Sequence, residues 1–319
     1  MSMSFQIFKK TVLASVIGAF SCVVQANILA SVKPLGLIAS SIADGVTETE
    51  IIVPPGASPH DYSLKPSDVK KVKSADVVLW IGEDVDGFLA KNIGSIDSSK
   101  VIEIAQLPEI KLRLGKSEHH HEHGDEKHAD HNHGHDHRSH DKDKHDKLSI
   151  NWHVWYSPEI SKVVARKLAD KLSEQYPDKK ALVAQNLENF NRTLAQQSEK
   201  ISTQLAPFAN KGFYVFHDAY GYFNDAYGLK QTGYFTINPL VAPGAQTLAT
   251  IKEEIKEHKV SCLFAEPQFT PRVIESLSKG TGVHIGHLDP MGDKVALGKN
   301  AYADFLQFTA DSYAECLNK

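Results

Sequence analysis

The sequence predicts an α/β protein built from two similar lobes with parallel-type sheets, joined by one long linker helix. Short, continuously apolar runs such as ADVVLWIG alternate with helical stretches, which is typical of strands covered by helices on both faces. This alternation occurs twice, once on each side of a long helical pattern that contains no Gly or Pro. A chain of 319 residues, 41% of them apolar, is long enough to bury two cores.

The N-terminal segment 1–26 is interpreted as a secretory signal peptide that is not part of the fold. It places Lys9 and Lys10 before the apolar run TVLASVIGAFSCVV and ends in the small-residue cleavage site VQA. An N-terminal anchor is the alternative, although the run is short for a transmembrane span. Removing the segment leaves 33 basic and 39 acidic residues, a net charge of −6, which gives no reason to expect a nucleic-acid partner.

The first lobe is assigned to residues 27–177. Its expected strands lie at 27–32, 48–54, 75–82 and 100–105, and its expected helices at 34–42 and 66–73. A further helix begins after Ser157, because the sequence Ser-Pro-Glu offers an N-cap, a proline in the first turn and an acid near the positive helix end. This helix ends near Tyr176.

The linker helix is assigned to residues 178–206, where apolar residues recur at helical spacing. About 28 helical residues would span about 42 Å, which is enough to reach from one lobe to the other. The second lobe is assigned to 207–319. Its expected strands lie at 212–216, 234–237, 260–266 and 283–289, and its helices at 218–227, 247–258, 271–279 and 301–317. This architecture predicts a ligand cleft between the lobes.

Residues 116–148 form a histidine-rich loop, and its part 118–147 holds eleven of the chain's 17 histidines. Without an apolar period the segment cannot bury surface, so we expect it to be disordered. Metal binding there would order a flexible chain, at a cost of about 1–2 kcal/mol per residue fixed. We therefore expect an auxiliary metal scavenger or sensor that raises the local metal concentration. A principal metal site and a passive solvated tract are the alternatives.

Two cysteines remain once Cys22 has left with the signal peptide. An even pair in an exported protein indicates a disulfide, here between Cys262 and Cys316. Metal binding by this pair is the competing interpretation. It is weaker, because neither cysteine belongs to a C-x-x-C pair.

Three isolated histidines lie at strand ends or just before helices, where open α/β sheets bind ligands. His60 follows a strand in PPGASPHDYSLKPSD, His153 precedes a helix in NWHVWYSPE, and His217 ends the strand FYVF. Asp289, in HLDPMGD, is a fourth such position. Three imidazoles and one oxygen ligand would make a tetrahedral zinc site that draws on both lobes. A lone histidine in a loop is more commonly hydrogen-bonded or exposed, and sequence spacing does not decide between these interpretations.

The motifs GASPHDYSLKPSD, NWHVWYSPE, FHDAYGYF and LDPMG occur together and in this order. They resemble the metal-binding solute receptors of ABC uptake systems, the cluster A-I group, over residues 27–319. The histidine-rich loop between the first two motifs resembles the zinc-specific members, and the placement of Cys262 and Cys316 resembles a disulfide in such receptors. The resemblance implies a periplasmic, monomeric receptor that carries the metal between its lobes and delivers it to the membrane permease of an ABC zinc transporter.

The resemblance also implies that His60, His153 and His217 are zinc ligands. Some zinc receptors carry Glu immediately before the first histidine, where this chain has Pro59, which leaves water or Asp289 as the fourth ligand. Manganese receptors of the same fold use an aspartate at the position matching Asp289. Imidazole-rich sites of low coordination number suit Zn²⁺, whereas Mn²⁺ prefers more oxygen ligands.

Two other functions are compatible with three histidines. A zinc-dependent hydrolase would use them to generate a metal-bound hydroxide. Against it, the sequence has no H-E-x-x-H motif and no evident paired general base beside the histidines, and Asp218 is interpreted as a helix N-cap. An extracytoplasmic metal buffer that delivers to no transporter is the other alternative. We expect a receptor and not an enzyme.

Overall fold

The structure is a computed structural model of the chain. It describes residues 27–114, 150–236, 239, 242–257, 259–269 and 272–319. The predicted signal peptide at 1–26 and the predicted histidine-rich loop at 116–148 lie outside these residues, so both stay predictions.

The first sheet contains four parallel strands in the order β2-β1-β3-β4. These strands are β1 (Asn27–Ala30), β2 (Glu48–Ile51), β3 (Val77–Trp80) and β4 (Val101–Glu103). The strand β3, with the sequence VVLW, is buried along its whole length, as expected of a strand covered on both faces. Because β2 and β3 lie on opposite sides of β1, the strand order reverses between β1 and β3, which is where such sheets bind ligands.

The second sheet repeats this topology in the order β6-β5-β7-β8, again with parallel strands only. Its strands are β5 (Phe213–His217), β6 (Gly233–Thr236), β7 (Cys262–Ala265) and β8 (His284–His287). Both β5 and β7 are fully buried, and the strand order reverses between them. The predicted fold class, two α/β lobes with parallel sheets joined by a long helix, is confirmed.

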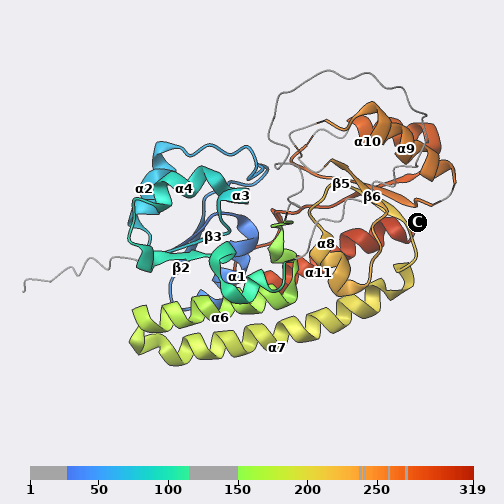
Figure 1. The fold of residues 1–319 in the computed structure, drawn as a ribbon. Coiled ribbons are helices and arrows are strands. Elements are labelled where there is room, and N and C mark those ends of the chain that lie inside the picture. Colours follow the sequence, from blue (N-terminus) through green and yellow to red (C-terminus); the bar gives the residue numbers. More distant parts are fainter. Residues whose placement is uncertain (1–26, 115–149, 237–238, 240–241, 258, 270–271) are drawn as a thin grey trace, which may run out of the picture.

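Helices cover both sheets and connect them (Figure 1). In the first lobe they are α1 (Lys33–Ala43), α2 (Pro66–Ser74), α3 (Glu83–Asp86), α4 (Ala90–Ile93) and α5 (Pro108–Lys111). The following helices are α6 (Pro158–Gln175), α7 (Lys180–Leu205), α8 (Gly221–Tyr227), α9 (Ala245–Lys256), α10 (Arg272–Thr281) and α11 (Ala301–Leu317). The sequence did not predict α3, α4 and α5, because a single turn is too short to carry a period. Within the described residues, no helix is both long and apolar enough to span a bilayer.

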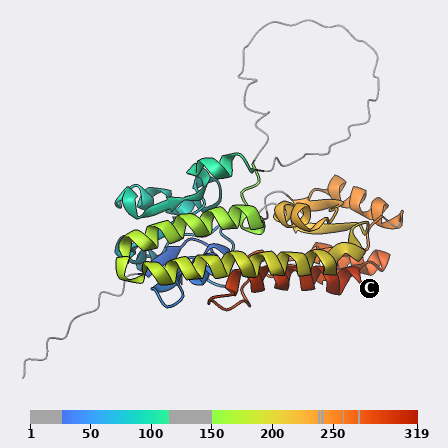
Figure 2. The same ribbon diagram turned by 90° about the horizontal axis from the view of Figure 1, so that it is seen from below.

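The predicted linker helix is α7, which runs along both lobes (Figure 2). It contacts α1 and α6, which precede it in the chain, and α8 and α11, which follow it. Its buried apolar residues form one stripe: Val183, Phe190, Leu194, Ile201 and Leu205. That stripe gives the helix a core-facing side along its whole length. The predicted domain limits at 177 and 206 stay predictions.

The C-terminal helix α11 forms a second connection between the lobes, which the sequence did not predict. It packs against α1 as well as α7. The fully buried Tyr302 on α11 donates a hydrogen bond to the carbonyl of Trp155 at 2.8 Å and accepts one from the Ser161 hydroxyl at 2.6 Å. The largest apolar cluster therefore runs without a break from α1 to α11.

The predicted disulfide is confirmed, because the sulfurs of Cys262 and Cys316 are bonded. The bond ties β7 to α11. The competing interpretation, metal binding by this pair, is wrong.

One helix begins later than predicted. The sequence indicates that α8 begins at Asp218 as its N-cap, but the helix begins at Gly221 and has no side-chain cap. The amide of Ala219 donates to the carbonyl of His217 at 2.8 Å. The chain therefore makes a tight turn after β5 before the helix starts.

Candidate metal centre

Three histidines that are far apart in the sequence lie together in the structure. One potential ligand atom from each of His60, His153 and His217 lies within 4.8 Å of those of the other two. His217 is the last residue of β5, and His60 lies in the loop between β2 and α2. His153 directly precedes the short 3₁₀ turn Val154–Tyr156 that leads into α6. Within the described residues, this is the only group of side chains with the spacing of metal ligands.

The three rings lie close to one another. The ring centroids of His153 and His217 are 5.0 Å apart, and that of His60 lies 5.5 Å from the first and 5.8 Å from the second. The Nε2 atoms of His153 and His217 are 3.2 Å apart. The Nε2 atom of His60 is buried and has no hydrogen-bond partner.

Glu266 fixes the ring of His217. This residue directly follows β7, the strand beside β5, so the two side chains meet where the strand order reverses. Its Oε1 and Oε2 atoms lie 2.8 and 2.7 Å from Nδ1 of His217. Because a carboxylate only accepts hydrogen bonds, Nδ1 carries the proton and Nε2 is left for a ligand.

Asn151 fixes the ring of His153 in a similar way. Its Oδ1 atom lies 2.8 Å from Nδ1 of His153 and also accepts the backbone N–H of that residue at 3.0 Å. Its Nδ2 atom donates to the carbonyl of Asp218 at 2.9 Å, which settles the orientation of the amide. The ring therefore donates from Nδ1, and Nε2 carries its lone pair inward.

Two Nε2 lone pairs thus face each other at 3.2 Å beside the unpartnered Nε2 of His60. Two lone pairs at this distance repel each other unless a proton or a cation lies between them. A tetrahedral zinc ion with Zn–N bonds of about 2.0–2.1 Å would separate its ligand nitrogens by about 3.3–3.4 Å. The observed spacing therefore fits zinc with little rearrangement.

Burial keeps the rings of His60 and His153 neutral near pH 7. Burial lowers the pKa of His60 to about 4, with a further contribution from His217. Burial, together with the neighbouring His217 and His60, holds the pKa of His153 well below its usual range. Neutral imidazole is the form that binds metal, so these two rings need lose no proton near pH 7 to bind one.

Asp289 is not a member of the three-histidine group. Its Oδ1 atom accepts from the Gln268 amide at 3.1 Å and from the Met291 backbone N–H at 3.0 Å, and its Oδ2 atom accepts from the Asp293 N–H at 2.7 Å. In this conformation the carboxylate caps the turn at 289–293. Its role as the fourth ligand stays a prediction.

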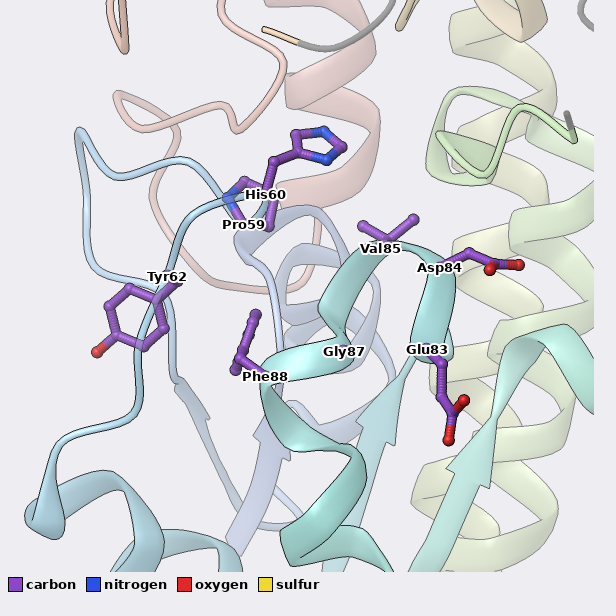
Figure 3. A pocket seen from close by; sticks show the side chains of 8 residues that line it. All are labelled: Pro59, His60, Tyr62, Glu83, Asp84, Val85, Gly87 and Phe88. Carbon is purple, nitrogen blue, oxygen red and sulfur yellow. The ribbon is translucent and has the colours of Figure 1, made fainter. Parts of the chain in front are cut away.

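Open space borders His60 on one side. A cavity of about 320 Å³ is lined by Pro59, His60, Tyr62, Glu83, Asp84, Val85, Gly87 and Phe88. Figure 3 shows the carboxylates of Glu83 and Asp84 pointing away from His60. His153 and His217 do not line this cavity. Of the three clustered histidines, His60 is therefore the one that borders open space.

The sequence did not identify Glu266 and Asn151 as residues of this centre. Each carried a usable signal: Glu266 follows an apolar strand directly, as His217 does, and Asn151 lies two residues before His153. The missing information was the neighbour relation of β5 and β7, which places Glu266 beside His217.

Known proteins resemble this chain over nearly its whole length. The high-affinity zinc uptake system protein ZnuA of Haemophilus influenzae is 68% identical to this chain over 318 residues. The alignment covers 92% of this chain and 94% of that protein. The corresponding protein of Haemophilus ducreyi is 53% identical over 312 residues, covering 98% and 100%. The solved structure of a ZnuA deletion mutant with zinc bound shares the fold of this chain, with a TM-score of 0.71. The two are 22% identical in sequence, and the match covers 91% of this chain and 97% of that chain.

The family match agrees with these relatives. Residues 28–316 match the family described as zinc-uptake complex component A, periplasmic. This range includes both lobes, all three clustered histidines and the disulfide. The chain therefore belongs to the ZnuA family of periplasmic zinc-uptake components.

Proposed function

We propose that this chain is the zinc receptor of an ABC importer and that it binds Zn²⁺ through the Nε2 atoms of His60, His153 and His217. One observation carries the proposal: two of these nitrogens face each other at 3.2 Å with both Nδ1 atoms held by oxygen acceptors. The third is buried without a partner. The named zinc-uptake relatives support zinc as the cargo.

The fourth zinc position is filled by water or by Asp289. The side chain of Pro59 has no ligand oxygen, and the carboxylate of Asp289 would have to give up some of the three hydrogen bonds that it accepts, whereas water requires no such rearrangement. Anomalous scattering at the zinc edge from crystals of the zinc-loaded protein decides between the two. A carboxylate oxygen within about 2.0–2.2 Å of the ion would identify Asp289 as the ligand.

The setting of this activity is part of the proposal. Residues 1–26 act as a signal peptide that directs the chain to the periplasm, and residues 27–177, 178–206 and 207–319 form the first lobe, the linker and the second lobe. The mature receptor is a monomer without a nucleic-acid partner, and it delivers zinc to a membrane permease. The histidine-rich loop at 116–148 collects or senses zinc and passes it to the three-histidine centre.

Zinc titration of three proteins tests the centre and the loop separately. We expect the full mature chain to bind one ion tightly, and expect this step to disappear when all three histidines are replaced by alanine. Deleting residues 118–147 should remove only weaker binding. If the tight step survives the triple replacement or is lost with the loop, the assignment is wrong.

The arrangement of the three-histidine centre favours a role in zinc transport over a role in catalysis. The only carboxylate that contacts a ring of the three histidines in the described part of the chain is that of Glu266, which is fully buried and engaged by Nδ1 of His217. It is therefore not placed to act as the general base of a hydrolase. We expect no ester or peptide turnover that is lost in His60→Ala, and expect growth under zinc starvation to require both this chain and the permease.

A further inference from the structure

We propose that Glu266 is a positioning residue of the zinc centre. Its carboxylate holds the Nδ1–H of His217, so that Nε2 faces the ion, and it adds one negative charge directly behind that ligand. This inference rests on the proposed zinc site and adds a residue outside the set of direct ligands.

The contacts of Glu266 leave it little freedom to move. Both oxygens reach Nδ1 of His217, and Oε1 also accepts the hydroxyl of Tyr220 at 3.1 Å. Tyr220 is itself fully buried, so it separates the carboxylate from water on that side. A carboxylate held in this way determines both the tautomer and the ring plane of the histidine.

The three rings are held unequally. His217 contacts a carboxylate, whereas His153 contacts the neutral amide oxygen of Asn151. No hydrogen bond to a ring nitrogen of His60 is found among the described residues. Glu266 is therefore the group that supplies negative charge to the rings, which otherwise offer a divalent cation only neutral nitrogen.

Burial makes this charge more effective. The side chain of Glu266 is 0% exposed and that of His217 is 3% exposed, so water screens little of the interaction between the carboxylate and a bound cation. A buried carboxylate without a nearby positive charge is also costly, and a zinc ion on the far side of the imidazole supplies that charge. Removing partners of this kind typically lowers metal affinity by about 10- to 100-fold.

The test compares Glu266→Gln with Glu254→Gln in the full mature chain. Glu254 is a matched control, because it lies in the same lobe and accepts a tyrosine hydroxyl, that of Tyr214, but contacts none of the three clustered histidines. Competition with a zinc chelator should give a Kd about 10- to 100-fold higher for Glu266→Gln. The Kd of Glu254→Gln should equal that of the unmodified chain.

A spectroscopic measurement separates positioning from general packing. In zinc-loaded protein with ¹⁵N-labelled histidine, the Nδ1 proton of His217 should give a downfield resonance that exchanges slowly with water. In Glu266→Gln this resonance should move upfield, because a neutral amide accepts the proton less strongly than a carboxylate. A role confined to packing would lower the melting temperature and leave both the resonance and the Kd unchanged.

The outcomes distinguish this inference from the proposed function. If the unmodified chain does not bind zinc, the proposed function fails. If it binds zinc and Glu266→Gln binds equally well with an unchanged His217 resonance, only the role of Glu266 is overturned. Should Glu266→Gln not fold, Tyr220→Phe removes one hydrogen bond from the same carboxylate, with an expected loss of about two- to fivefold. An unchanged Kd in that variant then overturns the inference.

Discussion

His60 differs from the other two clustered histidines in lining open space and in lacking a fixed ring partner among the described residues. It is nevertheless buried enough to lower its pKa to about 4. The ring is therefore neutral at the pH at which the protein would bind zinc. The lowered pKa should make the stability of the metal-free protein depend on pH in the acidic range.

We expect the metal-free protein to lose stability as the pH falls from about 6.5 to about 4. The unfolded chain binds a proton at His60 near the ordinary pKa of 6.5, whereas the folded protein does so only near 4. Between these values the unfolded state holds more protons, so stability is complete above the window and declines as the pH drops through it. The contribution of His60 is about 3 kcal/mol. Urea unfolding with a chelator present measures it.

His60→Gln provides the comparison for this pH dependence. The variant keeps a polar side chain but cannot take up the proton, so its stability should decline less over the same window. Equal declines in the two proteins would show that His60 titrates normally in the folded state. His153 contributes in the same direction in both proteins, because its pKa is also lowered.

The sequence identified the three histidines that lie together in the structure but missed the residues that hold two of their rings. His60, His153 and His217 stand in recognisable motifs at strand ends or before helices. Glu266 stands in an ordinary strand-end position, and its meaning depends on which strand lies next to β7. That neighbour relation is a property of the folded sheet and cannot be derived from local spacing.

Helix α6 begins where its local sequence predicts. The hydroxyl of Ser157 accepts the N–H of Ile160 at 3.2 Å, and Pro158 occupies the first turn, as predicted. The start matters for the centre because His153 lies four residues before the cap on the same short segment. Helix α8 shows the opposite case, since the backbone turn after β5 overrides the capping potential of Asp218.

Replacing Ser157 by alanine should destabilise the protein by about 1 kcal/mol, because the amide of Ile160 then loses its acceptor. Chemical denaturation of the zinc-free protein measures the change. Ser202→Ala, at an exposed position within α7, serves as the control and should change stability by less than about 0.5 kcal/mol. Equal effects of the two substitutions would contradict the capping role.

The two lobes are connected by a second helix besides the predicted linker. Helix α11 packs against α1, and the hydroxyl of Tyr302 joins α11 to the segment that begins α6. Nothing in the sequence of 301–317 indicates this contact, because an apolar stripe predicts that a helix is buried and not against which partner. With α7 and α11 both connecting the lobes, we expect zinc binding to move them little relative to each other.

The disulfide should contribute mainly to the stability of the second lobe. Cys262 and Cys316 are 54 positions apart, and closing a loop of that length in the unfolded chain corresponds to about 4 kcal/mol. Replacing both cysteines by alanine should lower the free energy of unfolding by about 2–4 kcal/mol. Denaturant unfolding measures this loss. A reduction of less than about 1 kcal/mol would contradict the entropic account.

The contact between α1 and α11 also determines when the protein can become folded. Lys33 at the start of α1 donates to the carbonyl of Asp293, 260 positions later, shortly before α11 begins. In a chain that emerges from a membrane channel N-terminus first, α6 and α7 can cover their sides of α1 early, but the side that packs against α11 stays uncovered until almost the last residues have passed. That side of α1 remains open to chaperones, proteases or aggregation throughout that interval.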